Sequence, residues 1–307
     1  MGLLTQMFPP NPPLPRRTWE TCPVYIITGS NTGVGKELAQ ILYSRNGTVY
    51  IAARSRDKAN EAINSIRKEH PSSGGRLEFL ALDLADLKAV AESARAFLAK
   101  ETKLDVLFNN AGLAVHNVGH QLLTEMLTPV LAQTAASYAS AGGVKNQVRV
   151  VWVSSAYSDM APANGFDPEN INYEKKDESK YYKYSQSKAG TIYQGTEYAR
   201  RFKDQGIISI PLNPGNLKSD LQRHHAGPLV LLGNLILYHP IHGAYTELFA
   251  GLSPEVTMEK SGSYVYPWGR FASMRADLEK GTRSKSEGGL AWRRFGMIGA
   301  TSRSSLL

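Results

Sequence analysis

The chain has 307 residues, 42% of them hydrophobic, and a formal net charge of +8. This length and apolar content allow a substantial core, in one large domain or two small ones. The 35 Lys and Arg residues are scattered rather than clustered, so the positive charge does not predict nucleic-acid binding.

The first 20 residues are rich in proline and predict a flexible, extended arm. They contain no long apolar run after a basic start, so no secretory signal is predicted. The longest apolar stretch, LVLLGNLIL at 229–237, is too short for a bilayer, so we expect no integral membrane segment. The single cysteine, Cys22, excludes an intramolecular disulfide and favours a cytoplasmic location. Because it precedes an apolar run, Cys22 is expected to be buried.

From residue 24, short apolar runs alternate with segments of helical period. Strands are expected at 24–29, 48–54, 76–84, 104–112, 148–155 and 207–215, and helices at 35–47, 57–70, 86–101, 118–141 and 179–204. This alternation predicts one doubly wound, Rossmann-type α/β domain over 21–275, with a mostly parallel sheet and helices on both faces. Ligands are then expected at the carboxyl ends of the strands. Residues 276–307 are expected to form an irregular tail.

The stretch TGSNTGVG (28–35) joins the first strand to the first helix. Gly29 permits a sharp turn, Gly33 permits close approach to a pyrophosphate, and Gly35 lets the helix pack near the sheet. The N-terminus of that helix then offers N–H groups to phosphates, which predicts a dinucleotide site. The second strand ends in Arg54 without a nearby acid, so we predict NADP(H), whose 2′-phosphate suits an arginine. Alternatively, Arg54 is a surface residue.

The stretch YSQSK (184–188) places Tyr184 and Lys188 four residues apart, on one face of a helix. A nearby ammonium lowers the pKa of a tyrosine, which can then exchange a proton with a carbonyl or alcohol oxygen. Ser154 and Ser155 end the fifth strand, where a hydroxyl could hold that oxygen. Each residue alone has a structural interpretation, because Tyr and Lys are common on helix surfaces and serines are common in turns.

In this order, TGSNTGVG, NNAG (109–112) and YSQSK resemble the TGxxxGxG, NNAG and YxxxK motifs of the short-chain dehydrogenases/reductases. RVVWVSS, LNPGNLKSDLQRH and HGAYTELFAGLS resemble retinol-dehydrogenase-like and fungal members. The resemblance implies that Tyr184 is the proton donor, that Lys188 lowers its pKa and binds the nicotinamide ribose, and that Ser155 holds the oxygen while Ser154 packs or caps. The predicted cofactor contacts are Gly29, Asn31, Thr32, Gly33, Val34, Gly35, Lys36, Arg54, Asp83, Leu84, Asn110, Ala111, Gly112, Tyr184, Lys188, Pro214, Gly215, Leu217 and Ser219. Asp83 could equally cap the following helix.

The sequence departs from the family pattern after NNAG. A family helix begins with an asparagine in a motif resembling N-x-x-G-H, and that asparagine holds a proton-relaying water. Here Gly119 and His120 fit the end of the motif, but His116 stands in the place of the asparagine and Asn117 is one residue late. Asn117 could still supply its carbonyl if the helix start shifts by one residue, or His116 could relay protons instead. The intervening family helix is expected to be absent.

We therefore predict an NADP(H)-dependent oxidoreductase that interconverts a carbonyl and an alcohol on an apolar small molecule, such as a terpenoid or polyketide of specialised metabolism. Segment 221–262, which contains the apolar stretch LVLLGNLIL, is expected to form a substrate lid. No metal ligands are predicted, and the resemblance allows a homodimer. The alternative is a protein that binds NADP(H) without turnover. A nucleotide-sugar epimerase is disfavoured by the spacing of Gly29 and Gly33 and by the short region after the sixth strand.

Overall fold

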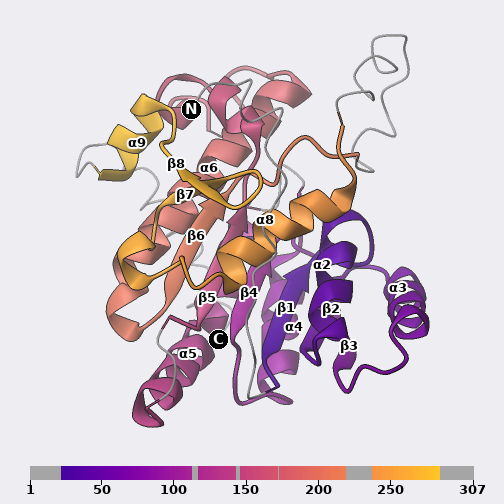
Figure 1. Ribbon diagram of the computed structural model, residues 1–307. Coiled ribbons are helices and arrows are strands. Elements are labelled where there is room, and N and C mark those ends of the chain that lie inside the picture. Colours follow the sequence, from indigo (N-terminus) through magenta and orange to yellow (C-terminus); the bar gives the residue numbers. More distant parts are fainter. Residues whose placement is uncertain (1–21, 113–116, 143–145, 172, 219–236, 284–307) are drawn as a thin grey trace.

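The computed structural model describes residues 22–112, 117–142, 146–171, 173–218 and 237–283, which fold around one central sheet (Figure 1). Within these residues the sheet has eight strands in the order β3-β2-β1-β4-β5-β6-β7-β8. All neighbouring strands are parallel except β7 and β8, which are antiparallel. The strands are β1 Val24–Thr28, β2 Thr48–Ala53, β3 Arg76–Ala81, β4 Val106–Asn109, β5 Arg149–Val153, β6 Ile208–Leu212, β7 Tyr264–Tyr266 and β8 Arg270–Ala272.

Helices cover both faces of the sheet. The α-helices are α2 Gly33–Ser44, α3 Arg56–Glu69, α4 Leu87–Leu98, α5 Asn117–Ser140, α6 Lys180–Phe202, α8 Pro240–Leu252 and α9 Ala276–Arg283. Short 3₁₀ helices are η2 Ala156–Met160, η3 Ala163–Gly165, η4 Lys203–Gln205 and η7 Met258–Lys260. The helices α2, α3 and α8 share one apolar core with the sheet, and α4, α5 and α6 share the other.

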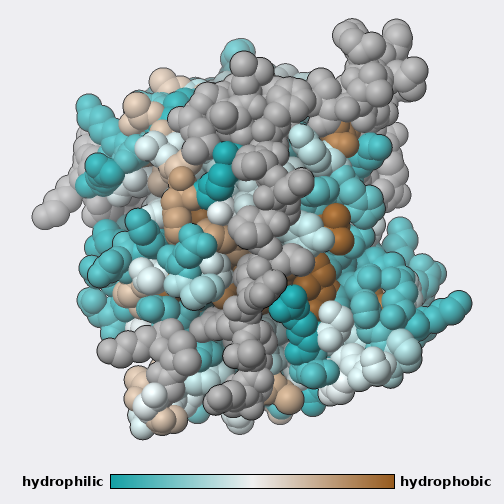
Figure 2. Space-filling model, in the orientation of Figure 1, coloured by the Kyte–Doolittle hydropathy of each residue, from teal (hydrophilic) through white to brown (hydrophobic). Residues whose placement is uncertain are grey.

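The alternation of side chains along the strands explains these two cores. In β5, Val151 and Val153 face the core under α8, whereas Val150 and Trp152 face the core under α5 and α6. Both faces are apolar, as expected of a parallel sheet covered on both sides. Figure 2 shows hydrophobic side chains between α8 and α2, and hydrophilic side chains over α3. The predicted doubly wound fold is confirmed, including all six predicted strands and all five predicted helices.

Some boundaries differ from the prediction. Each predicted strand from 76–84 onward ends earlier, because its last residues leave the sheet and form the loops at its carboxyl edge. Residues 264–272, which form β7 and β8, were not predicted as strands. Cys22 is exposed rather than buried. The N-terminal arm and residues 229–236 of the apolar stretch lie outside the described residues.

The predicted lid and tail also need correction. The C-terminal half of the lid, 221–262, contains α8, which packs on α2 and the sheet and belongs to the core. The predicted tail begins with a regular helix, α9, which packs against η3 and α6 through the buried side chain of Leu278. Both helices were missed because an amphipathic or apolar segment of 8 to 13 residues gives only a short periodic signal.

Gly119 lies where α5 approaches the loop after β3. A Cβ at this position would overlap the backbone carbonyl of Leu84. Replacing Gly119 with alanine is therefore expected to push α5 away from this loop and to lower the free energy of unfolding by about 2 kcal/mol. Urea denaturation measures this loss. The matched control is Gly74→Ala, because the nearest atom to a Cβ there is 3.6 Å away in the Asn46 side chain. Equal stability of the two variants would contradict the close contact.

Candidate active site

The hydroxyl of Thr28 joins three segments at the carboxyl edge of the sheet. Its Oγ1 accepts hydrogen bonds from the backbone N–H groups of Asn110 and Ala111, each at 2.9 Å, and lies 2.9 Å from Nε2 of His120 on α5. The side-chain amide of Asn110 donates in turn to the Thr28 carbonyl at 2.7 Å. The end of β1, the NNAG segment and the start of α5 are thereby held together. Our sequence analysis did not assign Thr28 a role, although it opens the glycine motif.

The glycine turn after β1 adopts the conformation that its glycines allow. Gly29 and Gly33 have φ of +69° and +57°, in the left-handed region that favours glycine. A Cβ on Gly35 would lie 2.6 Å from Nδ2 of Asn110, so only glycine permits this closeness of α2 to the sheet edge. A Cβ at Gly33 would meet no atom within 4 Å. The N-terminus of α2, with no acidic residue in its first turn, is suited to an anionic group.

Arg54 and Lys36, two basic residues predicted to bind the cofactor, differ in their surroundings. Arg54 follows β2 and is exposed at the carboxyl edge of the sheet. Lys36 instead donates to Oγ of Ser65 on α3 at 3.1 Å. The geometry therefore gives no support to the predicted cofactor contact of Lys36, while it leaves Arg54 accessible.

The loop after β3 contains the predicted pair Asp83 and Leu84. Oδ1 of Asp83 accepts from the N–H of Ala85 at 3.0 Å, and Leu84 is buried beneath Gly119. The helix that follows is capped by Asp86, whose carboxylate accepts from two N–H groups of its first turn. The alternative in which Asp83 caps this helix is therefore wrong.

The segment after β6 closes over the glycine turn. Gly215 has φ of +101°, and its N–H donates to Oδ1 of Asn213 at 2.9 Å. A Cβ on Gly243 of α8 would overlap Leu217 and would lie 3.1 Å from Val34. The predicted contacts Val34 and Leu217 therefore both lie against the same glycine of α8. Ser219 and His116 lie outside the described residues.

Ser155, Tyr184 and Lys188 come together beside this edge, from the loop after β5 and from α6. The Ser155 hydroxyl is hydrogen-bonded to the Tyr184 hydroxyl. Oγ of Ser154 donates to the Lys188 carbonyl at 2.7 Å, so Ser154 fixes α6 to β5. Nζ of Lys188 lies 5.4 Å from the centre of the Tyr184 ring. The three predicted catalytic side chains thus share one location, with Ser155 rather than Ser154 at the tyrosine.

The electrostatics of Tyr184 depend on its burial and on its hydrogen bond with Ser155. Burial raises the pKa of Tyr184 above its ordinary value, while the hydrogen bond with Ser155 opposes this shift. The ammonium of Lys188 donates to the carbonyl of Val153 at 3.0 Å and does not reach the Tyr184 hydroxyl. Lys188 is not among the causes of this shift, and the lowering of the pKa of Tyr184 by Lys188 stays a prediction. Burial also lowers the pKa of Lys188 to about 8.

Asn117 is the first residue of α5, one residue earlier than the predicted start of that helix. Its side-chain amide donates to the Ser187 carbonyl at 2.8 Å, and its own carbonyl accepts from Nε2 of Gln194 at 2.8 Å. Both bonds reach α6 on either side of Lys188. Helix α5 therefore starts at Asn117, as required for Asn117 to offer its carbonyl oxygen to a water. That oxygen already accepts a hydrogen bond from Gln194, a residue that our sequence analysis did not single out.

An apolar surface adjoins Tyr184. Tyr157, Met160 and Tyr181 are 37%, 69% and 55% exposed, among the few large hydrophobic side chains exposed within the described residues. The Tyr157 ring stacks on Tyr181 at 6.4 Å and meets the edge of the Tyr184 ring at 5.5 Å. Apolar rings therefore line the approach to the tyrosine hydroxyl.

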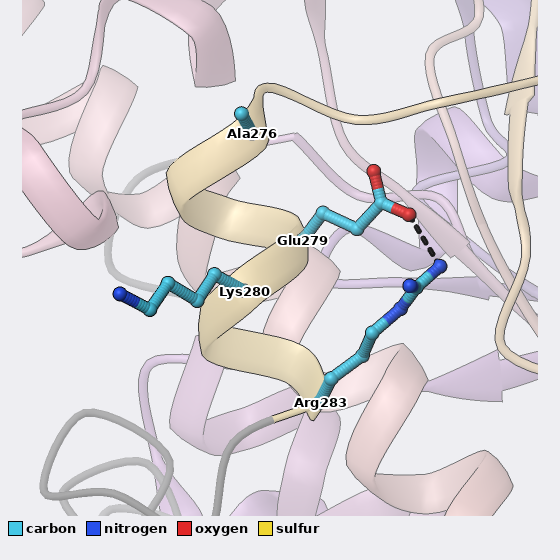
Figure 3. A pocket seen from close by; sticks show the side chains of 4 residues that line it. All are labelled: Ala276, Glu279, Lys280 and Arg283. Carbon is cyan, nitrogen blue, oxygen red and sulfur yellow. Dashed lines mark hydrogen bonds and ion pairs between the residues drawn. The ribbon is translucent and has the colours of Figure 1, made fainter.

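A surface hollow lies along α9, lined by Ala276, Glu279, Lys280 and Arg283 (Figure 3). Glu279 and Arg283 form an ion pair one turn apart there. Because α9 contacts α6 at Tyr193, more than two turns beyond Tyr184, this hollow is separate from the candidate site.

Two further kinds of site were sought within the described residues. No group of three or more His, Cys, Asp or Glu side chains is placed to hold a metal ion there. In that part of the chain, no helix combines the length and apolar character needed to cross a bilayer.

Comparisons with known proteins show the family of the chain and its fold. The family described as short chain dehydrogenase matches residues 23–164. A protein of Phomopsis amygdali named short-chain dehydrogenase/reductase is 44% identical over 288 residues, which cover 87% of this chain and 84% of the relative. Among solved structures, L-sorbose reductase from Gluconobacter frateurii with NADPH and L-sorbose has a TM-score of 0.60 and 18% identity, over 82% of this chain and 97% of that one. The 3-ketoacyl-(acyl-carrier-protein) reductase from Brucella melitensis with NADH has a TM-score of 0.60 and 19% identity, over 79% and 95%.

The hydroxyl of Thr28 is expected to contribute strongly to stability. Thr28→Val keeps the shape of this fully buried side chain but leaves the N–H groups of Asn110 and Ala111 without their acceptor. We expect the free energy of unfolding to fall by about 2 kcal/mol or more, measured by urea denaturation. Thr196→Val is the control, because that hydroxyl donates only to carbonyls of its own helix. A Thr28 variant as stable as this control would refute the role given to Thr28.

Proposed function

Because the chain belongs to the short-chain dehydrogenase/reductase family, we propose that it uses NADP(H) to interconvert a carbonyl and an alcohol on an apolar small molecule. The observation that carries this proposal is the convergence of Ser155, Tyr184 and Lys188 beside the glycine turn, at one edge of the sheet. A phosphate site and a proton donor at the same edge suit a dinucleotide and a reacting oxygen.

The residues of the glycine turn fit a dinucleotide. The left-handed Gly29 and Gly33, together with the start of α2, would receive the pyrophosphate. Lys188, freed from Val153, would face the nicotinamide ribose. Once bound, the nicotinamide group supplies the hydride. The fit rests on the backbone of the turn and on the absence of a carboxylate at the end of β2, which a ribose 2′-OH would require.

The roles of the side chains follow from their positions. In carbonyl reduction, Tyr184 donates its phenolic proton to the carbonyl oxygen, and in alcohol oxidation it accepts that proton. Ser155 donates a hydrogen bond to the same oxygen from the opposite side of the Tyr184 hydroxyl. Burial raises the pKa of Tyr184, and the hydrogen bond with Ser155 opposes that shift.

The exposed rings of Tyr157 and Tyr181 support an apolar substrate, because a flat or branched hydrocarbon skeleton would pack on them while its carbonyl reaches Tyr184. We extend this to a specialised metabolite such as a terpenoid or polyketide, in a cytoplasmic enzyme. Residues 221–236 of the predicted lid lie outside the described residues.

A second candidate function is NADP(H) binding without turnover. It is favoured by one observation: the carbonyl of Asn117 already accepts from Gln194, and Lys188 donates to Val153, so a proton relay through these two residues is interrupted. The two functions differ only in whether hydride reaches a substrate.

Transfer of deuterium from labelled NADPH separates them. Purified protein is incubated with a panel of apolar ketones and aldehydes, and the deuterated alcohols are measured by mass spectrometry. We expect transfer by the wild type and by Tyr181→Phe, which keeps the exposed ring, and a loss of about 100-fold or more in Tyr184→Phe. NADPH binding, measured by fluorescence, is expected to be retained in all three proteins. Binding without transfer in every protein would favour the second function, and no binding would reject both.

The preference for NADPH is expected to depend on Arg54. Arg54→Ala removes the guanidinium expected to bind the 2′-phosphate, and we expect the Kd for NADPH to rise about 10- to 100-fold. The Kd for NADH, which lacks that phosphate, should stay within about twofold. Arg45→Ala is the control, because Arg45 is also exposed but lies at the C-terminal end of α2, away from the glycine turn. Isothermal titration calorimetry measures both constants. Equal losses for the two cofactors would contradict the role of Arg54.

A further inference from the structure

Glu247 lies in the middle of α8 with no exposed surface. Both of its carboxylate oxygens are buried and have no hydrogen-bond partner among the described residues. A buried carboxylate without a partner is costly, so such a residue needs a compensating charge or a proton. Glu247 is also an isolated acid in the apolar stretch HGAYTELFAGL, which is the signal by which the sequence could have identified it.

The flanking glycines show where Glu247 points. Gly243 and Gly251 lie one turn before and after it and share its helix face. A Cβ on Gly251 would lie 2.5 Å from the Phe108 ring in β4, and a Cβ on Gly243 would overlap Leu217 beyond the end of β6. Glu247 therefore faces the sheet near the carboxyl ends of β4 and β6. The strand between these two is β5.

Lys188 reaches the same place from the other face of the sheet. It belongs to α6, which packs on the opposite core, and its Nζ donates to the carbonyl of Val153, the last residue of β5. Lys188 is itself only 5% exposed. The two buried groups attract each other, and each opposes the effect of burial on its partner. Burial raises the pKa of Glu247 to about 8 and lowers that of Lys188 to about 8.

Other charged groups around α8 are directed elsewhere. The guanidinium of Arg149 donates to the carbonyls of Ala250 and Ser253, at the far end of the helix. The pKa of His242, on α8 itself, is lowered by burial and by His239. The remaining titratable side chains on the elements packed against α8 are Lys36, Glu37 and Tyr43 of α2, and Tyr264 and Tyr266 of β7. Within the described residues, Lys188 is the charge that acts on Glu247.

We propose that Glu247 is a positioning residue whose carboxylate keeps Lys188 in its ammonium form at alkaline pH. The inference rests on the proposed function, since the ammonium is the form of Lys188 suited to the cofactor ribose. As the pH rises through about 8, Glu247 loses its proton, and the new negative charge holds the proton of Lys188. Without this carboxylate, Lys188 loses its proton at a lower pH.

A double-mutant cycle tests the coupling without any cofactor. The unfolding midpoint in urea is measured at pH 6.0 and 8.5 for the wild type, Glu247→Gln, Lys188→Met and the double variant. At pH 6.0 Glu247 is neutral in the folded protein, so the effect of Glu247→Gln should be small with or without Lys188. At pH 8.5 that effect should depend on the presence of Lys188. An identical effect of Glu247→Gln in both backgrounds at pH 8.5 would overturn the proposal.

The pH dependence of NADPH binding provides the functional measurement. At pH 6.5 the Kd of Glu247→Gln should equal that of the wild type, and its alkaline loss of affinity should begin about one pH unit lower. The control is Thr246→Val, which removes a buried hydroxyl from the same turn of α8 and should follow the wild type. Coincident pH profiles of Glu247→Gln and the wild type would also overturn the proposal. Should the wild type bind no NADPH, the proposed function fails, and the unfolding cycle still decides whether the two groups are coupled.

Discussion

The structure depends on one buried hydroxyl at the carboxyl edge of the sheet. Thr28 receives the N–H groups of the segment after β4 and contacts His120 of α5, so three separate stretches of chain take fixed positions around it. The glycine turn begins at the next residue. The position of the glycine turn therefore depends on the hydrogen bonds of the Thr28 side chain. A parallel sheet gathers its loops at one edge, and hydrogen bonds of this kind make those loops specific.

Close backbone approach then brings the helices to that edge. Gly35 lets α2 meet Asn110, Gly119 lets α5 meet the loop at Leu84, and Gly243 lets α8 meet Leu217. In each case an alanine would have to displace a neighbour. The shortened connection after the NNAG segment is compatible with this packing, because α5 still spans the distance between β4 and β5 as a parallel crossover requires.

The fold could be predicted from the sequence because long periodic segments determine it. Strands such as β1 and β5 are continuous apolar runs, and α4 has one clear apolar face. Strands β7 and β8 have three residues each, too few to show a period, and α8 is too apolar throughout its length to resemble a surface helix.

The site was predicted less completely, for a different physical reason. The spacing of the motifs predicted that Ser155, Tyr184 and Lys188 lie together. Spacing does not predict the hydrogen-bond acceptor of a long side chain. The ammonium of Lys36 donates to the hydroxyl of Ser65, and that of Lys188 donates to the carbonyl of Val153. The isolated acid in HGAYTELFAGL marks Glu247 as unusual, but the sequence does not show that Lys188 is the charge that acts on it, because the two residues lie on helices on opposite faces of the sheet.

The two amide bonds between α5 and α6 also bear on motion. The side-chain amide of Asn117 donates to the carbonyl of Ser187, and the side-chain amide of Gln194 donates to the carbonyl of Asn117. The first turn of α5 is therefore bonded to α6 at two points, one before and one after Lys188 in the sequence. The first turn of α5 also carries His120, which is bonded to Thr28. The helix bearing Tyr184 therefore cannot tilt alone. Opening of this corner must release α6, the start of α5 and the glycine turn as one cooperative unit, so their backbone amides should exchange with solvent at a common rate.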